Sequence, residues 1–108
     1  MGHELDPEEF DWDEGNVEKL WQRHRVTPGE AEQVLLGRPL VVARDEAHSL
    51  DETRCFALGR TDSDRLLFIV FTLIGEKVRV ISARDMTRRE RKAYEQARAQ
   101  EFETDPEV

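Results

Sequence analysis

Three apolar runs follow one another closely in the second half of the chain. They cover Arg54–Arg60, Arg65–Leu73 and Lys77–Arg84, and only the short turns Asp62–Asp64 and Gly75-Glu76 separate them. Parallel pairing needs a crossover of about a dozen residues or more, so neighbouring runs must pair as antiparallel hairpins. The middle run is apolar on both faces, which is typical of a central strand covered on both sides. The spacing therefore predicts three consecutive antiparallel strands.

Two helices are predicted before these strands. The first covers Asn16–Arg25, with Asp13 or Asn16 as its N-cap. Its apolar stripe, which we expect to be buried, consists of Val17, Leu20 and Trp21. The second begins at the capping box Thr27–Glu30, which has proline at the first helical position, and ends at Gly37 before Pro39. Its buried stripe consists of Ala31, Val34 and Leu35.

The remaining elements complete an α+β pattern. Leu40–Ala43 adds a short strand, and the capping box Thr87–Glu90 opens a final helix of about three turns with Tyr94 and Ala97 on its inner side. The prediction is two N-terminal helices, a four-stranded, mainly antiparallel sheet and a C-terminal helix. We expect a single domain over residues 10–100, a flexible acidic N-terminus over 1–9 and a disordered acidic tail over 101–108.

Charge is distributed unevenly along the chain. The formal net charge is −8, but twelve of the 24 acidic residues lie in residues 1–18 and 101–108, which contain no Lys or Arg. The intervening chain therefore carries all 16 bases against 12 acids, and seven of those bases fall within Lys77–Lys92. There is no apolar run of membrane-spanning length and no basic leader, so we expect a soluble, cytoplasmic protein.

Several common kinds of site are excluded or disfavoured. The chain has no phosphate-binding glycine loop, no serine-hydrolase elbow and no zinc pattern among its histidines and its one cysteine. Cys55 lies in a strand-like apolar run, where a buried thiol is the expected state. No metal or cofactor is expected.

The first candidate site is a group of arginines where the last strand meets the last helix. Arg88 and Arg91 lie one turn apart on the helix, and Arg84 ends the strand that leads into it. Three guanidiniums near a helix N-terminus would bind a phosphate and stabilise charge in a transition state. The alternative is a solvated surface with ordinary ion pairs along the helix.

Two further candidates lie earlier in the chain. His24, between Arg23 and Arg25, has the residue type for proton transfer in RNA transesterification, although a histidine at a helix C-terminus also interacts favourably with the helix dipole. Glu52 and Arg54 are two residues apart and share a face if the strand already runs there, either as a catalytic pair or as an edge ion pair.

Several segments, in this order, resemble the BrnT family of toxins from bacterial type II toxin–antitoxin pairs. The most specific segment is Val80–Arg84 followed by Thr87–Arg91 and Tyr94. The other matching segments are Phe10-x-Trp12-Asp13, Asn16, Arg23-His24, Val26–Ala31, Asp51-Glu52-x-Arg54 and Leu58–Arg60. The family's usual Lys-His-Gly reads Arg23-His24-Arg25 here, so an arginine replaces the glycine that ends the helix.

The resemblance implies a RelE-like α+β fold and metal-independent RNA cleavage that inhibits translation and arrests growth. It also implies a BrnA-like antitoxin whose complex with the toxin binds its own promoter DNA. The site residues that it implies are His24, Glu52, Arg54, Arg84, Arg88, Arg91 and Tyr94. The alternative is a non-catalytic module of the same family that binds a partner protein through its basic face.

Overall fold

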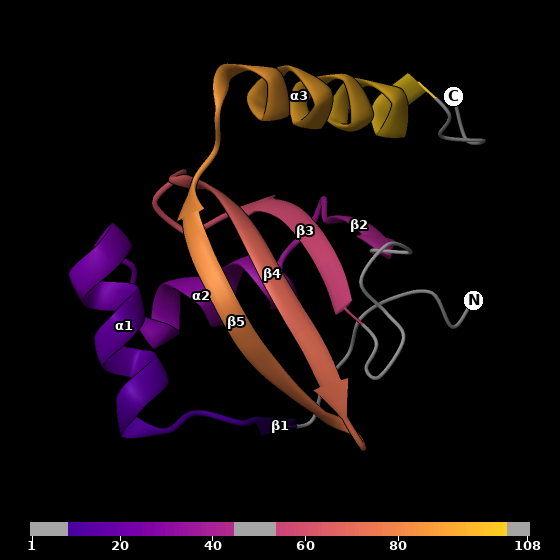
Figure 1. Ribbon diagram of the computed structural model, residues 1–108. Coiled ribbons are helices and arrows are strands. Elements are labelled where there is room, and N and C mark those ends of the chain that lie inside the picture. The colour runs from indigo at the N-terminus through magenta and orange to yellow at the C-terminus, as the bar shows by residue number, and fades with distance from the viewer. Residues whose placement is uncertain (1–8, 45–53, 104–108) are drawn as a thin grey trace.

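The structure, a computed structural model, describes residues 9–44 and 54–103 (Figure 1). In chain order the elements are β1 (Glu9–Phe10), α1 (Glu14–His24), α2 (Pro28–Leu36), β2 (Val41–Arg44), β3 (Arg54–Arg60), β4 (Leu66–Ile74), β5 (Lys77–Asp85) and α3 (Arg88–Glu103). The α+β class and the order of the predicted elements are confirmed. No helix in the described ranges has the length and apolar character that crossing a membrane requires.

The sheet has five strands in the order β1-β5-β4-β3-β2. The predicted hairpins are present, since β3 pairs with β4 and β4 with β5, both antiparallel. The prediction of four strands was one short: β1 adds a fifth strand, parallel to β5, with Glu9 opposite Lys77. Two residues are too few for an alternating pattern to be recognised in the sequence.

The hydrophobic core lies between one face of the sheet and the helices α1 and α2. From β4 it receives Leu67, Ile69 and Phe71, all fully buried, whereas Phe68 and Val70 on the opposite face are only half-buried. β4 is central, as predicted, but its two faces are covered unequally. The same cluster contains Leu20 of α1, Val26 of the connection between the two helices, and Ala31, Val34 and Leu35 of α2.

The second helix matches its prediction closely. Thr27 accepts a hydrogen bond from the Glu30 amide, and the Glu30 side chain accepts one from the Thr27 amide, which completes the predicted capping box. The first helix begins slightly earlier than predicted, at Glu14, because Asp13 is its cap and Asn16 completes the box.

The expected burial of Trp21 was wrong. The ring is 47% exposed, whereas Leu20 of the same predicted stripe is 3% exposed. α1 packs on β5, beyond which only the two-residue β1 remains, so the sheet is too narrow there to cover the whole stripe. Trp12, in contrast, packs against the core and donates its indole N–H to Glu32 at 2.8 Å.

The C-terminal helix α3 lies apart from the other two helices, at the end of the sheet where β5 finishes (Figure 1). Its cap is the predicted one, because Thr87 and Glu90 exchange hydrogen bonds. It is longer than the three turns predicted and continues to Glu103, three residues into the expected tail. Tyr94 is its buried anchor, and the phenol donates to the Pro39 carbonyl at 3.1 Å.

Candidate active site

At the junction between β5 and α3, the guanidinium of Arg84 is bound by a carboxylate. Its two terminal nitrogens donate to the two oxygens of Glu90 at 2.8 and 2.9 Å. The guanidinium also lies over the Phe68 ring, 4.2 Å from the centroid. Hydrogen bonds from Arg84 hold the pKa of Glu90 below its ordinary value. The fork that would receive a phosphate is therefore engaged within the protein.

Arg79, the other arginine of β5, is also compensated by carboxylates. It donates to Asp11 at 3.1 Å and to Asp13 at 2.7 Å, and the bond from Arg79 lowers the pKa of Asp13. Arg88 and Arg91 of α3 are exposed, and within the described part of the chain neither forms a side-chain hydrogen bond or ion pair. Within the basic segment Lys77–Lys92, the arginines of β5 are thus compensated by carboxylates, whereas Arg88 and Arg91 of α3 are open to solvent.

The remaining predicted residues are placed separately. Arg54 is half-buried at the start of β3, where it lies opposite Thr72 of β4. Tyr94 is buried, as described above, and Glu52 lies outside the described residues, together with His48 and Asp51. The buried thiol expected at Cys55 is only partly buried, and the burial that it has raises the pKa of the thiol.

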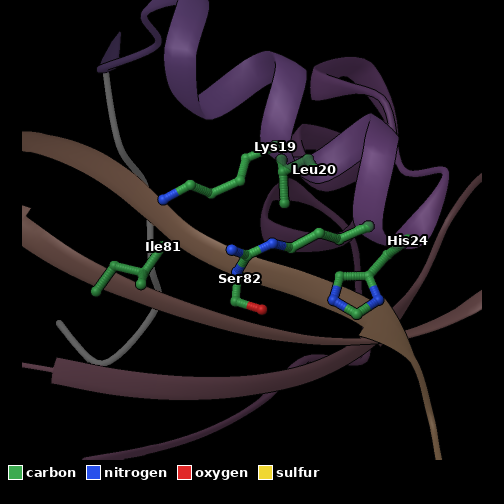
Figure 2. A pocket seen from close by; sticks show the side chains of 6 residues that line it. Lys19, Leu20, His24, Ile81 and Ser82 are labelled. Atoms are coloured by element: carbon green, nitrogen blue, oxygen red, sulfur yellow. The ribbon is translucent and has the colours of Figure 1, made fainter.

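His24 lies in different surroundings, beside an open hollow between α1 and β5. The hollow has a volume of about 30 Å³, far below the 300–1,000 Å³ typical of small-molecule pockets. It is therefore a shallow depression, suited to one group of a longer chain that lies across the surface rather than to an enclosed small ligand. Its lining consists of Lys19, Leu20, Arg23, His24, Ile81 and Ser82. Figure 2 shows Lys19 and His24 reaching from α1 toward β5, where Ile81 and Ser82 lie.

A bulge in β5 shapes the floor of this hollow. Ser82 pairs with Val70 and Val80 with Phe71, so Ile81 is an extra residue in the strand. Such bulges change the direction of neighbouring side chains and are frequent next to active sites. The Val80 carbonyl accepts a hydrogen bond from the Asn16 side chain at 2.7 Å, which holds α1 against the bulged strand.

Arg65 fixes the other end of α1. Its terminal nitrogens donate to the His24 carbonyl at 3.1 Å and to the Arg25 carbonyl at 2.8 Å. The same guanidinium bonds Asp85 at the end of β5 and contacts Glu30 of α2 at 3.3 Å. Its bonds to Asp85 lower the pKa of that carboxyl group. Arg65 thus sets the position of the His24 backbone relative to β5.

The sequence pointed to His24 and to the arginines beside it, but not to Lys19 or Arg65. Lys19 and Arg23 are one helical turn apart, a spacing that places two cations on one face, but many solvated helices share it. Arg65 begins an apolar strand, and nothing in its local sequence indicates contacts with three distant elements. The signal that could have found the hollow was the i, i+4 pair of bases next to the only histidine predicted to lie in a helix.

The helix α1 ends at His24 although the following C-cap position is occupied by arginine instead of glycine. Arg25 takes the left-handed conformation, with φ 56° and ψ 41°, and its amide bonds the carbonyls of Leu20 and Trp21. Glycine adopts this conformation at no steric cost, whereas an arginine incurs strain. Part of that cost is offset by the guanidinium, which lies 5.2 Å from the centroid of the Trp21 ring.

The hollow combines the groups that cleavage of a phosphodiester requires. Lys19 and Arg23 supply positive charge and N–H donors, the Ser82 hydroxyl supplies another donor, and the His24 imidazole has a nitrogen that can accept a proton. Within the described residues, no three His, Cys, Asp or Glu side chains form a group that could hold a metal ion.

Comparison with known families adds the decisive observation. The family described as "Ribonuclease toxin, BrnT, of type II toxin-antitoxin system" matches residues 12–90. The chain belongs to the BrnT family. The match covers most of the chain, including every residue that lines the hollow between α1 and β5. A comparison with curated proteins gave no match.

Membership of the BrnT family identifies the chain as a ribonuclease toxin of a type II toxin–antitoxin system, and such a toxin has a cognate antitoxin. The resemblance seen in the sequence is therefore confirmed. Of the seven predicted site residues, Arg91 and Tyr94 lie beyond the matched range. The match covers the segments that carry the others but assigns no role to any of them.

Proposed function

We propose that this BrnT toxin cleaves RNA in the hollow between α1 and β5. The observation that carries the proposal is the gathering of Lys19, Arg23 and His24 around one open hollow. Lys19 and Arg23 bind the phosphate, and they stabilise the extra negative charge of the transition state. Ser82 donates to a phosphate oxygen. Among the described residues, neither the β5–α3 junction nor the start of β3 combines cations with a histidine.

The reaction is a transesterification within the RNA and needs no metal ion. The ribose 2′-oxygen attacks the adjacent phosphorus while the bond from phosphorus to the 5′-oxygen breaks. The imidazole of His24 takes the proton of the attacking hydroxyl, and the leaving oxygen takes a proton from solvent. The products are a 2′,3′-cyclic phosphate and a free 5′-hydroxyl. Cleavage of cellular RNA inhibits translation and arrests growth.

The predicted arginines take supporting roles in this proposal. Arg88 and Arg91, exposed on α3, extend the surface that attracts the RNA backbone. Arg84 caps and orients α3 through Glu90 and would bind phosphate only after releasing that carboxylate. Arg54 and Glu52 remain candidates for orienting substrate groups. For Tyr94 we propose a packing role, since its ring is buried.

The partner that we propose is a BrnA-like antitoxin, encoded next to the toxin, and the complex of the two is proposed to bind promoter DNA. The support is the family to which the chain belongs. Co-expression with the neighbouring gene should abolish growth arrest and yield a complex that purifies together.

The phosphate contacts are tested by the salt dependence of binding. On single strands the logarithm of affinity falls with the logarithm of salt concentration by about 0.7 per phosphate contact. Replacing Lys19 and Arg23 with Ala together should therefore reduce this slope by about 1.4. The measurement uses RNA with 2′-O-methyl riboses, which lack the attacking hydroxyl. Arg38→Ala, an exposed cation outside the hollow, serves as the control.

An unchanged slope in the double variant, with the slope reduced instead by replacing Arg88 and Arg91, would move the site to the junction of β5 and α3. A protein that leaves RNA intact in the presence of a chelator and yet binds the antitoxin would favour the alternative, a non-catalytic binding module.

A further inference from the structure

Trp21 is a large exposed apolar side chain on α1, the helix that supplies Lys19, Arg23 and His24 to the hollow. Its ring remains 47% exposed even with the Arg25 guanidinium lying over it. An exposed indole loses the burial energy that stabilises most tryptophans. The other tryptophan of the chain, Trp12, is packed against the core. Trp21 is therefore the tryptophan available to a ligand.

The end of α1 presents three adjacent rows of side chains. In the first two rows, residues i and i+4 are neighbours on the helix surface. In the third row, Arg25 follows the helix as its C-cap and its guanidinium lies over the Trp21 ring. The first contains two cations, the second a buried leucine followed by the histidine, and the third the tryptophan and the arginine that lies over it. The rows are Lys19 with Arg23, Leu20 with His24, and Trp21 with Arg25. His24 thus stands between a pair of cations and an aromatic surface.

This order matches the chemistry of a nucleotide. The phosphate is anionic and requires cations, whereas the base has two flat π faces that stack on aromatic rings and on guanidinium planes. A chain whose phosphate lies against Lys19 and Arg23 would bring a neighbouring base across His24 toward Trp21. Arg25 adds a cation over the ring, and it lies there because its backbone turns in the left-handed conformation.

We propose that Trp21, supported by Arg25, is a stacking subsite for a nucleobase adjacent to the cleaved phosphodiester. The inference rests on the proposed function, because the subsite has meaning only if RNA occupies the hollow. Any of the four bases can stack, since each has a π face, so the subsite contributes affinity and register more than sequence readout.

The test compares two uncleavable oligonucleotides of about six nucleotides, a length within the range that single-strand binding sites cover. Both have 2′-O-methyl riboses, one has bases and the other is abasic, and both carry a fluorescent label for anisotropy. The wild-type protein should bind the first more tightly and show quenching of tryptophan fluorescence. Trp21→Ala should weaken that binding by roughly 5- to 100-fold, leave abasic binding unchanged and remove the quenching.

Two variants serve as controls. Trp21→Phe should recover part of the lost affinity, because phenylalanine also stacks. Leu36→Ala, which removes another exposed apolar side chain on α2, should bind both oligonucleotides like the wild type. Recovery by Phe separates stacking from a general disturbance of α1.

Three results would overturn the inference. If Trp21→Ala binds the oligonucleotide with bases as tightly as the wild type, while replacement of Lys19 and Arg23 weakens it, the subsite is wrong and the proposed function stands. If the wild type binds neither oligonucleotide, the proposed function fails and the subsite with it. If Trp21→Ala loses affinity for the antitoxin alone, the ring serves a protein partner instead.

Discussion

At the scale of single residues, the guanidinium of Arg65 connects three elements. It bonds the carbonyls at the end of α1, the carboxylate of Asp85 in β5 and that of Glu30 in α2, and its side chain is 26% exposed. Three points of attachment at one planar group define an orientation, which a single ion pair cannot do. Arg65 is accordingly a positioning residue for His24, because it touches the backbone and leaves the imidazole free to act.

Arg65→Lys should disturb this arrangement while keeping the charge. An ammonium cannot reproduce the fork, so several charge-assisted hydrogen bonds are lost together. We expect the free energy of unfolding, measured by urea denaturation, to fall by roughly 1–3 kcal/mol. RNA cleavage should fall with it under conditions in which the variant is fully folded.

Arg60→Lys is the matched control. Arg60 forms one exposed ion pair, with Asp64 at 2.7 Å, and pairs of that kind contribute only about 0–1 kcal/mol. Equal stability losses in the two variants, or full cleavage activity in Arg65→Lys, would show that Arg65 does not position His24.

At the scale of elements, α2 and α3 are held in the same way, each through a capping carboxylate that also binds an arginine outside its helix. In α2, Glu30 accepts hydrogen bonds from the Thr27 amide and from Arg65. In α3, Glu90 accepts hydrogen bonds from the Thr87 amide and from Arg84. The cap and the link to β5 therefore depend on the ionised state of one side chain. The pKa of Glu90 lies below its ordinary value of 4.5, mainly because of the hydrogen bonds from Arg84.

Lowering the pH should weaken the attachment of α3, because it protonates Glu90. A carboxyl group whose pKa is lower in the folded state contributes stability in full above its unfolded value, and the contribution is lost as the pH falls through the folded value. Glu90→Gln removes this contribution at neutral pH. The midpoint of thermal unfolding, measured between about pH 6 and pH 3, should therefore fall less steeply for the variant than for the wild type. Parallel curves that differ only by a constant offset would contradict the role given to Glu90.

Elements with strong local signals could be predicted from the sequence, and those that depend on distant partners could not. The capping boxes at Thr27 and Thr87 and the close spacing of the hairpin strands are local, and all three are confirmed. β1 exists only because it pairs with β5, whose partner residues lie far along the chain. The exposure of Trp21 follows from the width of the sheet beneath α1, which no local pattern contains.

The candidate site shows the same division. His24 could be recognised by its residue type and its place at a helix end. Counting bases, however, pointed to Lys77–Lys92, since a count does not show which arginines are paired. Arg79 is bound by Asp11 and Asp13, which precede it by more than 60 residues in the sequence. Pairing at such separations is decided by the fold.

At the scale of the whole molecule, the fold redistributes a charge pattern that is acidic overall. Carboxylates from several elements compensate the arginines of β5 and the start of β4. Among the cations without such partners in the described ranges are two groups that each share a helix: Lys19 with Arg23 on α1, and Arg88, Arg89, Arg91 and Lys92 on α3. Single exposed cations, such as Arg38 and Lys77, lie elsewhere. Of the two groups, only that on α1 adjoins a histidine.

The most direct measurement is the single-turnover rate constant for cleavage of a labelled RNA in the presence of a chelator and at saturating protein. It compares His24→Ala with a variant in which Arg88 and Arg91 are both Ala. Loss of a proton-transfer group should lower the rate constant by about 10²- to 10⁴-fold, whereas the arginine variant should need more protein for saturation and then cleave at nearly the wild-type rate. A His24→Ala variant that cleaves at the wild-type rate, with activity lost in the arginine variant instead, would place the chemistry at α3 and contradict the assignment of the hollow as the active site.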